Sequence, residues 1–223
     1  MNNEITKSTQ PKRPKLYTLG EEIMNAITHG VGAGLVIAAT VLLIIRAAFR
    51  ADAMAIVAVA IYGASLIILY TMSTLYHSLT NSTAKHVFRI FDHCTIFVLI
   101  AGTYTPYTLV TLRGALGWTI FGILWGLTVL GIVTNAISIE KSKVFSMISY
   151  VIMGWCIVFA MKPTVIGLGF WGTFFVFIGG VFYTVGIIFY AKTKIRYMHS
   201  VWHLFVLAGS IFPFFSVYFW VLK

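Results

Sequence analysis

The sequence predicts an all-α integral membrane protein, built as a bundle of seven transmembrane helices. Hydrophobic residues make up 59% of the 223-residue chain and charged residues only 10%, whereas soluble domains average about 45–50% and about 25%. The mean hydropathy is +0.91. The apolar residues form long runs, not the alternating segments of about ten residues that are typical of membrane β-barrels. These observations favour membrane-spanning helices.

The charged residues divide the chain into seven apolar runs. Each is near or above the roughly 20 residues that an α-helix needs to cross about 30 Å of hydrocarbon. The runs cover residues 25–45, 53–77, 93–112, 115–139, 144–161, 164–190 and 198–222. Residues 21–223 are therefore expected to form one transmembrane domain. Residues 1–20 are polar and contain prolines, so we expect a mobile basic cytoplasmic tail there.

Prolines and glycines within the runs predict where helices bend or approach each other. Pro106 and Pro213 lie inside runs and are expected to kink helices, because proline leaves a backbone carbonyl without its usual partner. Gly30 and Gly34, like Gly122 and Gly126, have the small-xxx-small spacing that lets membrane helices pack closely.

The distribution of Lys and Arg predicts the orientation. The formal charge of +10 lies in short basic clusters between apolar runs, which indicates membrane topology and no nucleic-acid partner. With the N-terminus in the cytoplasm, eleven of the 16 Lys and Arg residues lie inside, namely Lys7, Lys12, Arg13, Lys15, Lys85, Arg89, Lys141, Lys143, Lys192, Lys194 and Arg196. An inward N-terminus and an outward C-terminus follow from the positive-inside rule.

On this topology the six histidines all belong to the cytoplasmic half of the protein. His199 and His203 are one helical turn apart and share a face, so they can offer two imidazoles to one metal ion at roughly 2.0–2.1 Å. His77 ends its run at the same depth. Three imidazoles leave a fourth tetrahedral position open, as in catalytic zinc sites. The alternative is that interfacial histidines bind lipid headgroups or backbone carbonyls.

Asp92 and Ser73 are the candidate catalytic residues. Asp92 begins the third run, and carboxylates inside membranes are costly and usually paired or functional. It can act as a general base toward a zinc-activated water, or it can form a salt bridge to Arg89, one turn earlier. Ser73 precedes His77 by one turn. It can orient His77 or polarise a substrate carbonyl, or it can bond only to the helix backbone.

A polar stripe enters the first run. Glu22, Asn25 and His29 follow each other at helical spacings of three and four. The stripe fits a polar network behind the site or an ordinary interfacial helix cap, and the spacing does not choose between them.

Four stretches together resemble the haemolysin III family, the bacterial branch of the progestin and adipoQ receptors, which include the adiponectin receptors. They read "EIMNAITH", "STLYH", "RIFDHCTIFVLIAGTYTP" and "HSVWH". The resemblance covers the chain from Glu22 to its end. It implies a multi-pass protein of the bacterial plasma membrane with its N-terminus in the cytoplasm. It also implies Zn²⁺ held by His77, His199 and His203, with Asp92 reaching the metal through water and Ser73 nearby.

The resemblance further implies a function, because the wider superfamily includes alkaline ceramidases and is associated with lipid amide hydrolysis. We expect a zinc-dependent hydrolase of an amide or ester bond in a membrane lipid, with that lipid as substrate or ligand. The alternatives are a membrane sensor or stress protein with a structural zinc, and a haemolysin-like cytolytic protein. An elongated apolar cavity reaching the metal would favour the hydrolase. The sequence leaves the substrate and the oligomeric state open.

Overall fold

The computed structural model describes residues 17–50, 52–192 and 194–223, and no strand occurs among them. Its seven α-helices are α1 (Leu19–Arg50), α2 (Ala53–Ser78), α3 (Ser82–Pro106), α4 (Gly114–Ile137), α5 (Ile139–Gly154), α6 (Met161–Ala191) and α7 (Met198–Ser216). Three tighter or wider helical turns accompany them, η1 (Tyr107–Leu112), η2 (Cys156–Ala160) and η3 (Val217–Val221). Residues 1–16 of the expected tail lie outside the described part, and Leu19 already belongs to α1.

Six segments of the described chain are long and apolar enough to cross a membrane. Five of them correspond to α1, α2, α3 with η1, α4, and α7 with η3. The remaining segment, Ile139–Ala191, joins α5, η2 and α6 in one stretch of 53 residues. The expected all-helical membrane protein is confirmed, with six such segments where the sequence predicts seven crossings.

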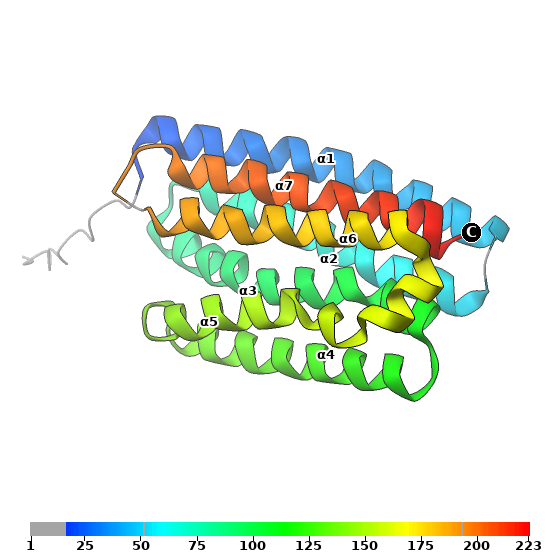
Figure 1. The fold of residues 1–223 in the computed structure, drawn as a ribbon. Helices are drawn as coiled ribbons and strands as arrows, with labels where there is room; N and C mark the ends of the chain where they lie inside the picture. Colours follow the sequence, from blue (N-terminus) through cyan, green and yellow to red (C-terminus); the bar gives the residue numbers. More distant parts are fainter. Residues whose placement is uncertain (1–16, 51, 193) are drawn as a thin grey trace, which may run out of the picture.

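The helices pack side by side along one long axis (Figure 1). Helix α1 packs against α2 and α7, α2 against α3, and α6 against α7. Helices α5 and α6 run in opposite directions on either side of η2, and the described chain begins at one end of the bundle and finishes at the other (Figure 1). The starts of α1, α3 and α7 and the end of α2 therefore lie at the same end of the bundle.

Polar side chains explain where three helices begin. The carboxylate of Asp52 accepts a hydrogen bond from the backbone N–H of Ala55 at the start of α2. Asn81 accepts from two backbone N–H groups at the start of α3, and Ser138 accepts from one in α5. Each cap satisfies backbone donors that have no partner within the helix.

Helix α3 begins well before its apolar run. It starts at Ser82 rather than near residue 93, so His86, which the topology assigns to a cytoplasmic loop, lies on α3 instead. The physical reason is that charged residues mark where the hydrocarbon ends, but they do not end a helix. The cap at Asn81 and the absence of a breaker in "STAKHVFRIFDH" let the helix continue outward.

The prolines fall next to wide helical turns. Pro106 is the last residue of α3, before the π-helical turn η1, and Pro213 lies in α7 shortly before η3. The hydroxyl of Tyr107 donates to the carbonyl of Pro213 at 3.2 Å, which ties the two irregular regions together.

The prediction of close packing at the four spaced glycines holds for Gly30 alone, where an added Cβ would lie 3.6 Å from the Thr74 side chain of α2. A side chain at Gly34, Gly122 or Gly126 would meet nothing within 4 Å. Close approach occurs instead at Gly63, which faces Thr40 of α1, and at other glycines between helices. Spacing alone therefore did not identify the buried helix faces.

Candidate metal centre

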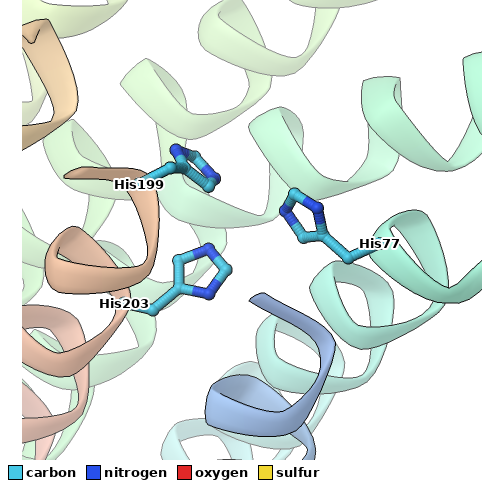
Figure 2. Close-up of side chains that lie close together, drawn as sticks. All are labelled: His77, His199 and His203. Carbon is cyan, nitrogen blue, oxygen red and sulfur yellow. The ribbon is translucent and has the colours of Figure 1, made fainter. Parts of the chain in front are cut away.

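Three histidines from two helices meet at the end of the bundle where α1 begins. His77 comes from the last turn of α2, and His199 and His203 come from the first turns of α7. One ring nitrogen from each residue lies within 4.8 Å of the other two. His77 and His203 are buried and His199 is partly buried. Figure 2 shows the ring of His77 facing those of His199 and His203 across a common space.

The nitrogens of this cluster fit a metal ion. Nε2 of His77 and Nε2 of His199 are buried and make no hydrogen bond with any described residue. An unpaired buried polar atom costs about 1–3 kcal/mol, so such atoms call for a ligand. Three imidazoles are a ligand set that zinc accepts, with one tetrahedral position left open.

Hydrogen bonds at the far side of two rings determine which nitrogen is available. Nδ1 of His77 lies 2.7 Å from the Glu22 carboxylate, and Nδ1 of His203 lies 3.2 Å from the carbonyl of Asn25. Carboxylates and carbonyls only accept hydrogen bonds. The Thr28 hydroxyl, 3.1 Å from Nδ1 of His203, donates to backbone carbonyls of α1 and can therefore accept from this ring. Both Nδ1 atoms therefore carry the proton. This leaves the unprotonated Nε2 of each ring for a metal.

The polar stripe of α1 faces this cluster. The side-chain oxygen of Asn25 accepts from Ser200 at 2.6 Å, and its amide nitrogen lies 3.4 Å from Nδ1 of His77. The ring of His29 stacks on that of His203 with centroids 3.5 Å apart. With the bond from His77 to Glu22, these contacts make the stripe a network behind the histidines and not an interfacial cap.

Asp92 does not pair with Arg89 as the salt-bridge alternative required. The Arg89 guanidinium bonds instead to Glu140 of α5 at 2.7 Å. Asp92 is buried, and its carboxylate lies 3.6 Å from Nδ1 of His93. It shares the lining of one cavity with His199 and His203.

Ser73 is fully buried, one turn before His77. Its hydroxyl oxygen makes no hydrogen bond with the described residues, so the local bond to the helix backbone, expected as the alternative role, is not formed.

An elongated cavity of about 90 Å³ leads away from the histidines. Its lining runs from Asp92 of α3 to Tyr107 at the start of η1 and includes residues of α5, α6 and α7. At about 1.5 Å per residue, this part of the lining spans roughly 22 Å along the helix axis. The walls are mainly apolar and aromatic, with Leu99, Ile100 and Val206 among them.

Three residues around the site were not identified from the sequence. Lys85 forms an ion pair with Glu22, Ser200 bonds to Asn25, and the ring of Tyr17 lies 5.0 Å from that of His199. Ser200 lies within the "HSVWH" stretch, between the two histidines of α7, and this position could have indicated that it belongs to the site. Tyr17 falls in the residues assigned to the tail, and the partner of Lys85 depends on tertiary packing.

The fold and the site define a class: helical multi-pass membrane proteins with a buried histidine cluster at one end of the bundle. The chain belongs to the family described as Haemolysin-III related, whose sequence profile matches residues 17–214.

Similarity to three other proteins supports this family assignment. The chain is 44% identical to Hemolysin-3 of Bacillus cereus over 222 residues, which covers 100% of this chain and 98% of that protein. It is 45% identical to the Hemolysin-3 homolog of Bacillus subtilis (strain 168) over 208 residues, 93% and 98% of the two chains. It is 26% identical to the human monocyte to macrophage differentiation factor over 167 residues, 71% and 68% of the two. That more distant match supports the resemblance to adiponectin receptor-like proteins.

Proposed function

We propose that the chain crosses the bacterial plasma membrane seven times, with its N-terminus in the cytoplasm and its C-terminus outside. The segment Ile139–Ala191 has 53 residues. As one helix it would measure roughly 80 Å, whereas the hydrocarbon core is about 30 Å thick. It is interrupted at Cys156–Ala160, which supports two crossings. The described chain begins at one end of the bundle and finishes at the other in Figure 1, which supports an odd total. The excess of Lys and Arg on the side assigned to the cytoplasm supports an inward N-terminus.

We propose that the protein is a zinc-dependent hydrolase of an amide or ester bond in a membrane lipid. Zinc held by imidazoles supplies a Lewis acid that polarises a carbonyl and lowers the pKa of water to about 7. The single observation that carries the proposal is the cavity, because it joins His199, His203 and Asp92 to a long apolar space.

The residues of the chain divide the work. His77, His199 and His203 would hold the ion, and the bonds of His77 and His203 to α1 hold those rings in place. Asp92 accepts one proton of the water whose oxygen bonds to the carbonyl carbon. It delivers this proton to the amine or alcohol as the bond from that carbon to the leaving group breaks, so that a fatty acid is released. Ser73 polarises the substrate carbonyl by donating a hydrogen bond from its hydroxyl group to the carbonyl oxygen, and it keeps its proton. The apolar cavity holds the acyl chain and excludes water from it.

The test uses the purified full-length protein in lipid nanodiscs. Vesicles that contain a labelled long-chain N-acyl lipid or its ester analogue are supplied, and the release of free fatty acid is measured. We expect turnover with zinc, loss of turnover after chelation, and recovery when zinc is restored. Zinc-loaded protein that releases no fatty acid from either lipid would contradict the hydrolase and favour a structural zinc in a membrane sensor.

Membrane lysis is the second candidate, favoured by the name that the Bacillus cereus relative carries. The purified protein is added to dye-loaded vesicles. Dye release without fatty-acid release would support lysis, whereas fatty-acid release from vesicles that keep their dye would support the hydrolase.

A further inference from the structure

The carboxylate of Glu22 lies between a candidate metal ligand and a cation. One oxygen of the carboxylate is 2.7 Å from Nδ1 of His77, and the other is 2.9 Å from Nζ of Lys85. The three residues come from α1, α2 and α3. Only 17% of the Glu22 side chain is exposed, and the His77 side chain is fully buried. The contact is therefore largely shielded from water, and a hydrogen bond with an ionised partner is strong in such an environment.

The contact with Glu22 determines which nitrogen of the His77 ring carries the proton. Nδ1 has two polar neighbours, the Glu22 carboxylate at 2.7 Å and the Asn25 amide nitrogen at 3.4 Å. The first is much shorter and pairs a donor with a charged acceptor, so it determines the tautomer, with the proton on Nδ1. Nε2 then has a free lone pair, and this atom is buried without a hydrogen-bond partner among the described residues.

Lys85 holds the carboxylate in place. Its Nζ also donates to the backbone carbonyls of Tyr76 at 2.9 Å and Leu79 at 3.3 Å, at the end of α2. These carbonyls have no partner within the helix, and a cation near a helix C-terminus is stabilising. Lys85 therefore anchors itself on the helix that carries His77 and compensates the charge of Glu22.

We propose that Glu22 is a positioning residue, which fixes the tautomer and direction of His77 and raises its basicity toward the metal, with Lys85 as its counter-ion. This inference rests on the zinc site of the proposed function. Carboxylates that accept from a metal-bound histidine commonly determine affinity, and their loss costs about 10–100-fold. The role is independent of which lipid is the substrate.

The experiment measures zinc affinity of the full-length protein in detergent by competition with a fluorescent chelator. We expect Glu22→Leu to lose about 10–100-fold in affinity. Glu22→Gln should lose less, because its amide oxygen still accepts from Nδ1 although the charge is gone. Glu21→Gln is the matched control: it removes the same charge one residue earlier, where the carboxylate bonds to Thr18 and Tyr197 and not to a histidine.

A second readout separates positioning from general stability. With Co²⁺ in place of zinc, the visible absorption reports the geometry of the ligands. We expect Glu22→Leu to change this spectrum, Glu22→Gln to restore it in part, and Glu21→Gln to leave it as in the wild type. Wild-type affinity and spectrum in both Glu22 variants would overturn the role of Glu22. A wild-type protein that binds no zinc would instead overturn the metal site itself.

Discussion

The ring of His29 lies flat against the ring of His203, with centroids 3.5 Å apart and planes within 10° of each other. The rings of His29 and Tyr70 of α2 also meet in a T-shaped contact with centroids 4.9 Å apart, so one α1 side chain packs between the two helices that carry the cluster. Both ring nitrogens of His29 are buried without hydrogen-bond partners in the described residues. The contact therefore supports His203 through its flat ring and not through a hydrogen bond.

This relationship predicts different outcomes for two variants of His29. His29→Ala removes a buried ring and should destabilise the protein by about 2 kcal/mol or more, with weaker zinc binding. His29→Phe keeps a flat ring and should retain zinc affinity and thermal stability. Thermal unfolding and chelator competition on both variants provide the measurement. Equal losses in the two would contradict support by stacking.

Asp92→Asn should separate metal binding from chemistry. The carboxylate is not one of the three clustered histidine ligands, so zinc affinity should fall by about 10–100-fold at most. Lipid hydrolysis should fall by about 10²–10⁴-fold, as is typical for loss of a general base. Asp52→Asn is the control, because Asp52 lies at the opposite end of α2. Unchanged turnover per folded molecule would show that Asp92 is structural.

The two chain ends should lie on opposite sides of the membrane. A tag before residue 1 should be protected in intact cells, and a tag after Lys223 should be accessible, as the distribution of basic residues requires. Protease or antibody access to each tag provides the measurement. Finding both tags on one side would require an even number of crossings.

The carboxyl group of Asp52 should contribute to the stability of the protein in a way that depends on pH. The backbone N–H of Ala55, together with Arg113, lowers the pKa of its carboxyl below the ordinary value. A lowered folded-state pKa gives stability that is present above the unfolded value of about 3.9 and is lost as the pH falls through the folded value. Asp52→Asn keeps a capping oxygen but should remove this dependence. Melting temperatures from pH 6 down to pH 3 test it, and parallel wild-type and variant curves would contradict it.

The fold class and the histidine pairing were accessible from the sequence because each depends on local pattern. The spacing of His199 and His203 places them on one helix face whatever the tertiary structure. Adding His77 to this pair required one further inference, namely that its apolar run ends at the same depth in the membrane. The partners of Arg89 and Glu22 were not predictable, since they depend on how helices rotate against each other: Arg89 bonds to Glu140, 51 residues away, and not to Asp92, three residues away.

The zinc content of the purified protein tests the central claim most directly. Metal analysis after purification without chelators should find about one zinc per chain in the wild type. The His199→Ala/His203→Ala variant should contain almost none, because one imidazole and water rarely hold zinc tightly. A His86→Ala variant is the control, since His86 lies on α3 outside the cluster, and it should keep its zinc. A wild-type protein without zinc, or a double variant with full zinc, would contradict the assignment of His77, His199 and His203 as a metal site.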